Sequence, residues 1–330
     1  MNIVVDAMGG DNAPLQVVKG ALDAALEYKN INITLVGDET KIRDCAKELE
    51  MTFTDNISIV HTDVAVSMED DPMVVMKEKS DSSMAVGLRL LKDDKGDAFV
   101  SAGSTGALHT ASTLIVRKIK GVRRSAIGAI LPFNPPILLL DSGANPVVTP
   151  DLLLQWALIG SAYMKKVFGV ENPRVGLLNN GTEEHKGTPT ICEAYSLLKN
   201  NNTINFVGNI ESKEIPTSPC DVLVTDGFTG NITLKFAEGM GKFIGRKLTE
   251  IFKSNIFTKL SYLFTFKKKI KKFKKEMDAS EYGGAPLLGL SKPVIKAHGS
   301  SKAKEIKTAI RQAIEYSRSN IIQDVAKDLK

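Results

Sequence analysis

Short runs of valine, isoleucine and leucine recur along this 330-residue chain and alternate with longer stretches of helical periodicity. The runs NIVVD (2–6), ILLLD (137–141) and DVLVT (221–225) are apolar at nearly every position, which is typical of strands covered on both faces. Alternation of such strands with helices predicts an α/β fold with a mostly parallel sheet and crossover helices. The predicted strands are 2–6, 32–36, 98–102, 126–130, 137–141, 174–179, 204–208, 221–225 and 293–298. The predicted helices are 14–27, 82–93, 105–118, 151–168, 189–199, 229–254 and 302–324.

No repeat, low-complexity linker or clear compositional boundary divides the chain. Its length is sufficient for one large α/β domain or for two smaller ones. We expect a single catalytic domain over residues 1–330, with an amphipathic, lysine-rich helical hairpin inserted over residues 246–280.

The first residues, MNIVVDAMGGD, carry no basic segment and reach an acid at Asp6, which is unlike a signal peptide. No apolar run approaches the ~18–20 residues needed to span a bilayer. The cysteines Cys45, Cys192 and Cys220 are widely separated, so their spacing predicts neither a disulfide framework nor a metal site. We therefore expect a cytoplasmic protein without a bound metal.

One short segment carries much of the positive charge. Residues 267–275 read KKKIKKFKK, with seven lysines in nine positions, and are called the lysine block below. Outside the block 36 of the 43 basic residues remain, against 38 acidic residues. An apolar and aromatic stretch, 256–266, directly precedes the block. This combination is typical of segments that dock on an anionic membrane, where each lysine contributes about 1 kcal/mol.

Other interpretations of this segment stay open. It is also compatible with a core helix followed by a solvated charge run, or with binding of an acidic protein partner. Nucleic-acid binding is not indicated, because no DNA- or RNA-binding motif accompanies the block. The residues expected to contact a membrane or an acidic partner are Phe257, Leu260, Leu263, Phe264, Lys267, Lys268, Lys269, Lys271 and Lys272.

Six predicted strands end in clusters of Gly, Asp, Asn, Ser and Thr. Since the carboxyl ends of parallel strands share one edge of a sheet, we expect the clusters to meet at a ligand site there. Clusters that open a helix aim free backbone amides at this edge and favour an anion. A single cluster is explained by turn chemistry alone, but six are not. The clusters are DAMGGDNAP (6–14), SAGSTGA (101–107), DSGAN (141–145), NNGTEEHKG (179–187), TDGFTGN (225–231) and AHGSS (297–301).

The same clusters limit the chemistry. None is a GxGxxG fingerprint or a Walker P-loop, so they indicate an oxyanion such as phosphate rather than a nucleotide. No Ser-His-Asp, Cys-His or HExxH pattern stands out. Cys45 and Cys192 lie in helical stretches and are expected to be buried, which argues against a covalent thiol mechanism.

The clusters VDAMGGDNAP, SAGSTGAL, DSGAN, VGLLNNGTE followed by HKG, VTDGFTGN, YGGAPLLGL and VIKAHGSS occur in an order that resembles the bacterial phosphate acyltransferase family. The resemblance runs from Asn2 to about Arg318. It implies that inorganic phosphate attacks the thioester of a long-chain acyl carrier protein, giving acyl phosphate for phospholipid synthesis. It also implies a doubly wound α/β/α fold similar to isocitrate and isopropylmalate dehydrogenases, a homodimer, and no organic cofactor. Peripheral membrane association is implied too, because the product passes to a membrane-bound glycerol-3-phosphate acyltransferase.

Phosphate is already a nucleophile, so such an enzyme must hold it, aim it and stabilise the oxyanion that forms. We expect the amides of 103–106 and 228–231 to cradle the phosphate, Lys186 to pair with its charge and Asn231 to donate to phosphate or oxyanion. His298 is the candidate for proton transfer to the leaving thiolate. The other residues expected to bind phosphate or acyl substrate are Asp6, Gly9, Gly10, Asp11, Gly103, Ser104, Thr105, Gly106, Asn145, Asn179, Asp226, Gly227, Thr229 and Gly230.

Three rival functions stay open at this point. A phosphate acetyl- or butyryltransferase would use the same phosphate chemistry on coenzyme A thioesters. A decarboxylating dehydrogenase of similar fold would need a nicotinamide site and a metal-binding aspartate group. A non-catalytic membrane scaffold would use the glycine clusters only as turns.

Overall fold

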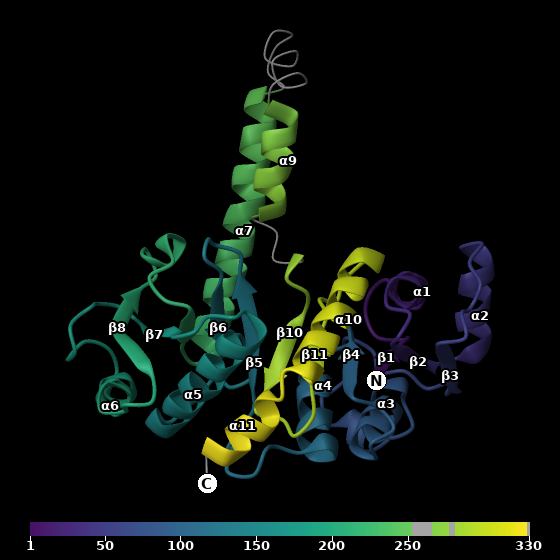
Figure 1. The fold of residues 1–330 in the computed structure, drawn as a ribbon, viewed down its shortest axis with the longest axis horizontal. Coiled ribbons are helices and arrows are strands. Elements are labelled where there is room, and N and C mark those ends of the chain that lie inside the picture. The colour runs from purple at the N-terminus through teal and green to yellow at the C-terminus, as the bar shows by residue number, and fades with distance from the viewer. Residues whose placement is uncertain (253–265, 277–280, 329–330) are drawn as a thin grey trace.

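A computed structural model of the chain describes residues 1–252, 266–276 and 281–328 (Figure 1). Within these residues eleven strands form one sheet, in the order β3-β2-β1-β4-β11-β10-β5-β6-β9-β7-β8. The strands are β1 (Asn2–Asp6), β2 (Asn32–Gly37), β3 (Ile57–His61), β4 (Ala98–Ser101), β5 (Ala126–Leu131), β6 (Ile137–Leu140), β7 (Arg174–Asn179), β8 (Asn205–Glu211), β9 (Val222–Val224), β10 (Ala285–Leu288) and β11 (Val294–Lys296). The helices are α1 (Leu15–Glu27), α2 (Glu39–Glu48), α3 (Ser83–Lys92), α4 (Thr105–Ala111), α5 (Pro150–Val167), α6 (Pro189–Lys199), α7 (Gly227–Phe252), α9 (Lys267–Glu276), α10 (Ala303–Arg318) and α11 (Ile321–Asp328).

The sheet consists of two parallel halves that run in opposite directions. Strands β3, β2, β1, β4 and β11 are parallel neighbours, and so are β6, β9, β7 and β8. Strands β10 and β5 lie between the halves, and the pairs β11–β10, β10–β5 and β5–β6 are antiparallel. The predicted mostly parallel α/β sheet is therefore confirmed. The three antiparallel pairs that reverse its second half are additional to the prediction.

Each predicted strand is present, and the structure adds three elements. Strands β3 and β10 and helix α2 were not in the predicted set. Strand β10 lies within GAPLLGLS (284–291), where glycine and proline weaken the strand pattern. The predicted helix 302–324 is wrong as one unit, because Asn320 takes a left-handed backbone conformation (φ 58°) that ends α10 before α11 begins.

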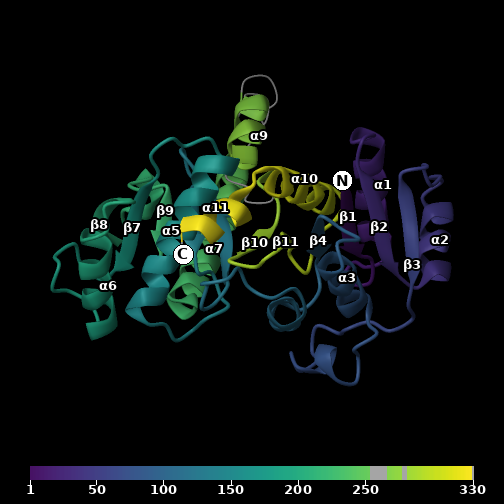
Figure 2. The same cartoon turned by 60° about the horizontal axis from the view of Figure 1, so that its bottom comes forward.

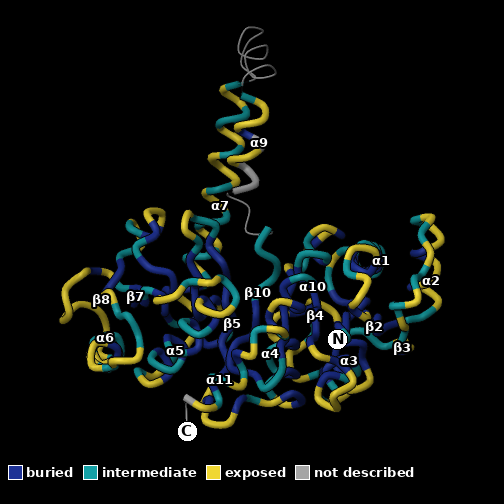
Figure 3. The backbone as a smooth tube through the Cα atoms, in the orientation of Figure 1, coloured by how far each residue is buried: buried dark blue, intermediate teal, exposed yellow. Residues whose placement is uncertain are grey.

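Alternate side chains of the central strands enter cores on the two faces of the sheet, as a strand's period of two requires. In β1, Ile3 and Val5 belong to the core that α1 and α10 cover, whereas Val4 belongs to the core that α3 and α4 cover. Figure 3 shows the strands as the most deeply buried part of the chain. This two-faced burial explains why the strands are apolar at nearly every position.

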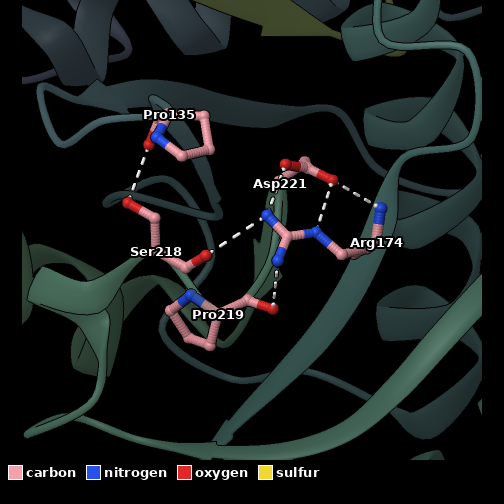
Figure 4. A network of polar contacts seen from close by, with 5 residues as sticks. All are labelled: Pro135, Arg174, Ser218, Pro219 and Asp221. Atoms are coloured by element: carbon pink, nitrogen blue, oxygen red, sulfur yellow. Dashed lines mark hydrogen bonds and ion pairs between the residues drawn. The ribbon is translucent and has the colours of Figure 1, made fainter.

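The amino-terminal ends of β7 and β9 are held together by a charged pair (Figure 4). The Arg174 side chain donates to both carboxylate oxygens of Asp221, at 3.1 and 2.9 Å, and also to the carbonyls of Pro219 and Ser218. The Ser218 hydroxyl donates to the carbonyl of Pro135 at 2.8 Å. This network fixes the register of the second half-sheet from the end opposite to its polar clusters.

Helices α7 and α9 project side by side from the body of the molecule (Figure 1). The aromatic rings of Phe252 and Phe266, near the outer ends of the two described helical segments, lie 5.3 Å apart. Lys267, Lys268, Lys269 and Lys272 are exposed on α9. Among the described residues, no helix combines the length and apolarity needed to cross a bilayer. The predicted contact residues Phe257, Leu260, Leu263 and Phe264, and the side chain of Lys271, lie outside the described residues.

Candidate functional site

The predicted site residues fall into two sets, at the carboxyl ends of the two half-sheets. The expectation of one common edge is wrong, because β6, β9 and β7 run against β1, β4 and β11. The first set, called the β4 edge, is Asp6, Gly9, Gly10, Asp11, Gly103, Ser104, Thr105, Gly106 and His298. The second set, called the β9 edge, is Asn145, Asn179, Lys186, Asp226, Gly227, Thr229, Gly230 and Asn231.

The twist of the sheet turns these two edges toward the same side of the molecule. Neighbouring strands rotate by about 20–25°, so the six steps from β1 to β9 accumulate about 120–150°. Strands that run in opposite directions along the sheet then point within about 30–60° of each other in space. Figure 2 shows β8, β7 and β9 on the left and β1, β2 and β3 on the right, with β10 and β11 between them. Helix α4, which begins at the β4 edge, lines a pocket together with Asn145 of the β9 edge.

Although the two edges turn toward the same side, they are too far apart for both to contact one small ligand. Strands β4 and β9 are five steps apart in the sheet, which corresponds to about 24 Å at ~4.8 Å per step. The amides of 103–106 and of 228–231 are therefore too widely separated for both to be expected around one phosphate.

At the base of the β9 edge lies a buried carboxylate that is surrounded by hydrogen-bond donors. Asp141, which follows β6, is fully buried and accepts hydrogen bonds from the backbone amides of Ile127, Gly143, Ala144 and Asn145, at 2.7–3.2 Å. The Asn145 side-chain amide adds a further bond of 2.9 Å. This carboxylate has no capacity left for a ligand, so its role is to fix the turn 141–145 under helix α7.

Helix α7 begins directly on this turn. Asp226 caps the helix by accepting from the amide and the hydroxyl of Thr229, at 2.8 and 2.7 Å. The amide of Gly227 donates to the carbonyl of Asn145. A Cβ at Gly230 would lie 1.9 Å from the carbonyl oxygen of Asp141, so only glycine permits this approach. Asp226 therefore has the N–H partner that was expected for it, and it positions the start of the helix.

Two predicted groups at the β9 edge are available for a ligand. Asn231 donates from its side-chain nitrogen to the carbonyl of Ser142 at 3.1 Å, and no bond to its side-chain oxygen is seen in the described residues. Lys186 is exposed in the loop after β7, and the described residues give it no ion pair. Asn179 shapes this loop, since its side chain donates to the carbonyl of Lys186 at 2.9 Å. The edge thus joins a free cation and an amide side chain beside the start of α7. Of the amides 228–231 expected to cradle phosphate, those of Thr229 and Gly230 already donate to Asp226.

The β4 edge is built around another buried carboxylate. Asp6 accepts from the hydroxyls of Ser83 and Ser101, at 2.6 and 2.7 Å. Burial raises the pKa of Asp6, although these hydrogen bonds oppose the change. Gly10 has φ 107°, and a Cβ there would lie 2.9 Å from the Ala102 side chain. The β4 edge is therefore closely packed, with Gly9 and Gly103 beside Asp6.

His298 ends the β4 edge at the surface. Its Nδ1 lies 2.9 Å from the hydroxyl of Ser300 and accepts from the Ser300 amide at 3.2 Å. With Nδ1 accepting, Nε2 carries the proton and faces no described partner. This arrangement is compatible with the predicted proton transfer, although His298 belongs to the opposite edge from Lys186 and Asn231.

Lys296 is a buried cation that the sequence reasoning missed. It lies at the end of β11, is 7% exposed, and donates to the carbonyls of Ala102 and Ala297. Burial lowers the pKa of Lys296 to about 8, against the attraction of Asp11 and Asp6. The signal that could have revealed it is a lysine inside the apolar run PVIKAH, where a strand covered on both faces leaves no solvent for a charge.

Replacing Lys296 by methionine is expected to change how stability depends on pH. The lowered pKa means that the unfolded chain holds this proton up to its ordinary value of 10.5, whereas the folded chain releases it near 8. The free energy of unfolding of the parent therefore rises by about 3 kcal/mol between pH 8 and 10.5. Below pH 8 the buried lysine is charged, and the parent is destabilised by that full amount. Urea unfolding at pH 7, 8, 9 and 10 should show a variant that is more stable at pH 7 and lacks this rise.

A matched control for this experiment is Lys165→Met, which removes an exposed lysine on α5. Its free energy of unfolding should follow the parent at every pH. A Lys296→Met variant whose pH curve ran parallel to the parent would contradict the lowered pKa.

A pocket connects α4 to the β9 edge. Its volume is about 230 Å³, and its lining includes His109, Ser125, Arg124 and Asn145. The ring Nε2 of His109 lies 3.1 Å from the Ser125 hydroxyl, and the Asn145 side chain donates to the Ser125 carbonyl at 2.9 Å. Burial lowers the pKa of His109, so the ring is neutral near pH 7.

The described residues contain no group of three His, Cys, Asp or Glu side chains placed to hold a metal ion. Of the cysteines, Cys45 and Cys220 are buried, and burial raises the pKa of both thiols, to about 12 for Cys220. Neither thiol is therefore a thiolate nucleophile near neutral pH.

Comparison with known sequences gives a match along almost the whole chain. A family model described as "Fatty acid synthesis protein" matches residues 1–324. A protein of Acetivibrio thermocellus named "Phosphate acyltransferase" is 46% identical over 99% of this chain and 96% of its own length. A protein of the same name from Bacillus subtilis is 42% identical over 100% of this chain and 98% of its own length.

Comparison with solved structures shows the fold. A phosphotransacetylase from Streptococcus pyogenes superposes with a TM-score of 0.64 at 17% identity, covering 96% of this chain and 94% of that one. A putative 4-hydroxythreonine-4-phosphate dehydrogenase from Salmonella typhimurium gives a TM-score of 0.53 at 12% identity, covering 96% and 98%. These neighbours confirm the predicted dehydrogenase-like α/β fold.

Proposed function

The chain belongs to the fatty acid synthesis protein family, and we propose that it is a phosphate acyltransferase that moves a long-chain acyl group from acyl carrier protein to inorganic phosphate. The observation that carries this proposal is the identity of 42–46% over nearly the full chain with relatives named "Phosphate acyltransferase". The acyl phosphate would supply phospholipid synthesis. The site geometry supports the chemistry without a covalent enzyme intermediate.

In the proposed reaction a phosphate oxygen attacks the thioester carbon, the carbonyl oxygen becomes an oxyanion, and the carbon–sulfur bond then breaks. We place the phosphate at the β9 edge, against the start of α7, where the helix dipole favours an anion. Lys186 neutralises its charge, and Asn231 donates to the phosphate or the oxyanion. The leaving thiolate takes a proton. His298 is the candidate donor, and because it lies at the β4 edge the thiolate would meet it only after leaving the β9 edge.

The β4 edge is then assigned to the part of the acyl donor that lies away from the reacting carbon, because the thioester itself must meet the phosphate at the β9 edge. The buried carboxylate of Asp6 holds Ser83 and Ser101 in place and so shapes the turn that carries Gly103. Ser104, Thr105 and Gly106 open helix α4 beside it, and no side chain caps this helix. Thr105 and Gly106 are exposed, so their amides face solvent and a substrate.

The donor is tested with thioesters of one acyl chain on two carriers. Palmitoyl-acyl carrier protein should give a kcat/KM at least tenfold above that of palmitoyl-coenzyme A, with phosphate as acceptor in both assays. The opposite preference would favour the rival phosphate acetyl- or butyryltransferase activity. Absence of phosphate-dependent turnover with either donor would remove the enzymatic proposal.

We also propose that the protein is a homodimer that associates peripherally with the membrane, near the glycerol-3-phosphate acyltransferase that consumes its product. The exposed lysines of α9, projecting with α7 away from the sheet, support the membrane contact (Figure 1).

Changing Lys267, Lys268, Lys269, Lys271 and Lys272 to serine is expected to reduce flotation with anionic liposomes at least fivefold, because each lysine near an anionic surface contributes about 1 kcal/mol. Flotation with neutral liposomes should not change. Equal recovery of parent and variant on anionic vesicles would show that the lysine block does not bind lipid.

A further inference from the structure

A second basic surface lies on the opposite part of the molecule from the lysine block. Residues 117–124, called the basic loop below, join the helical segment after α4 to strand β5 and read RKIKGVRR. The loop contains five cations and no acid. Arg117, Lys120, Arg123 and Arg124 are exposed. The proposed reaction assigns no role to this loop.

The basic loop has a fixed conformation. The Ile119 amide donates to the carbonyl of Gly289, and the Ser291 amide donates to the carbonyl of Arg117. Arg117 has φ 71° and ψ 170°, a region of backbone space that is essentially reserved for glycine. Such strain persists only where the surroundings impose it, and it is concentrated at functional positions. The cations are therefore presented on a rigid support and not on a loose turn.

Most of this charge is uncompensated. In the described part of the chain the only ion pair of the loop joins Arg123 to Asp151 at 3.0 Å, and both side chains are more than half exposed. The Arg124 guanidinium donates to the carbonyl of Val147, and Lys118 donates to the carbonyl of Arg123. Carbonyl oxygens orient these cations but leave their charge for a partner.

The basic loop also borders the pocket that reaches the β9 edge. Lys118, Arg123 and Arg124 line its rim, and Asn145 lines its inner end. The carbonyl of Asn145 accepts from the amide of Gly227, the first residue of α7. Two large apolar side chains are exposed in neighbouring parts of the chain. Val147, whose carbonyl accepts from Arg124, is 76% exposed, and Leu114, which follows the lining residue Thr113, is 49% exposed. A cationic rim with exposed apolar residues is typical of a surface that binds a protein.

We infer that the basic loop is the docking surface for the acidic face of the protein that carries the acyl group. This inference rests on the proposed function, which requires a protein-borne thioester to reach the β9 edge. Positive charge on the rim attracts the acidic carrier, Leu114 and Val147 supply apolar contact, and the pocket leads toward Asn145. The lysine block is a poorer candidate, because α9 projects from the top of the molecule in Figure 1, whereas α4, which supplies His109 to this pocket, lies in its lower part.

The test is the charge-reversed variant Arg117→Glu/Lys120→Glu/Arg124→Glu, measured for binding of palmitoyl-acyl carrier protein. We expect its Kd to rise at least tenfold, and the increase of Kd with salt to be weaker than in the parent, because fewer charge pairs form. Phosphate should stabilise the variant against thermal unfolding as much as it stabilises the parent. That readout is independent of the carrier and reports an intact β9 edge.

The matched control reverses three exposed lysines elsewhere, Lys29→Glu/Lys95→Glu/Lys165→Glu, with the same change in net charge. Its Kd for the carrier should stay within twofold of the parent. Unchanged carrier binding in the loop variant would overturn the inference, and so would a loss of affinity that instead follows replacement of the lysine block. Loss of phosphate stabilisation in the loop variant would also overturn it, since the loop would then be part of the phosphate site. Failure of the parent to use the carrier at all would count against the proposed function itself.

Discussion

Replacing Asn231 by alanine is expected to lower kcat/KM for acyl phosphate formation by about 10²–10³-fold, the usual effect of losing one oxyanion donor. Asn231 is the fifth residue of α7, and its side-chain nitrogen donates one hydrogen to the carbonyl of Ser142. The second hydrogen on this nitrogen is the one proposed to donate to the oxyanion. The loss should appear mainly in kcat, because the donor acts on charge that develops only in the transition state.

The companion variant Lys186→Ala should lose at least tenfold, through weaker phosphate binding and hence a higher KM for phosphate. Asn180→Ala is the matched control, because Asn180 is exposed on the same loop and has no role in the proposed reaction. Its kcat/KM should remain within twofold of the parent. Activity within twofold of the parent for both Asn231→Ala and Lys186→Ala would remove these residues from the site.

The second large effect concerns stability. Replacing Asp141 by asparagine should lower the free energy of unfolding by about 3–5 kcal/mol, as breaking a buried charged network does. Each carboxylate oxygen accepts from several donors, and an amide nitrogen in place of one oxygen would face amide hydrogens with no acceptor. Urea unfolding of parent and variant measures the difference. The turn under α7 should loosen, so activity should fall as well.

Asp151→Asn is the control for this experiment. Asp151 forms an exposed ion pair with Arg123, and such pairs contribute about 0–1 kcal/mol. Equal destabilisation by Asp141→Asn and Asp151→Asn would show that the hydrogen bonds to Asp141 do not stabilise the turn 141–145.

Local patterns were sufficient to predict much of the fold. The apolar runs at 2–6 and 137–141 are strands because both of their faces are buried, and burial of this kind is visible in the sequence itself. The glycine clusters were correctly placed at strand ends. Their arrangement in space was not predictable, because strand direction depends on β10 pairing between β11 and β5, and no local pattern encodes that pairing.

The same limit applies to the site. Asp226 was grouped with the substrate-binding residues and was expected to have an N–H partner. That partner is the amide of Thr229, and the cap on α7 that results is visible only in the folded chain. Lys296 and Asp141 both lie in the glycine-containing segments that carry the family resemblance. Their individual roles were missed, because these roles depend on burial and on partners distant in the chain. The pocket beside the basic loop joins residues from 109 to 145, and its shape exists only in the folded chain.

The most direct measurement of the central claim is turnover with palmitoyl-acyl carrier protein and isotopically labelled inorganic phosphate. The account predicts that the label appears in palmitoyl phosphate, with one free carrier thiol released for each labelled product. Release of the thiol without labelled palmitoyl phosphate would contradict it, because the acyl group would then pass to an acceptor other than the anion held at the start of helix α7.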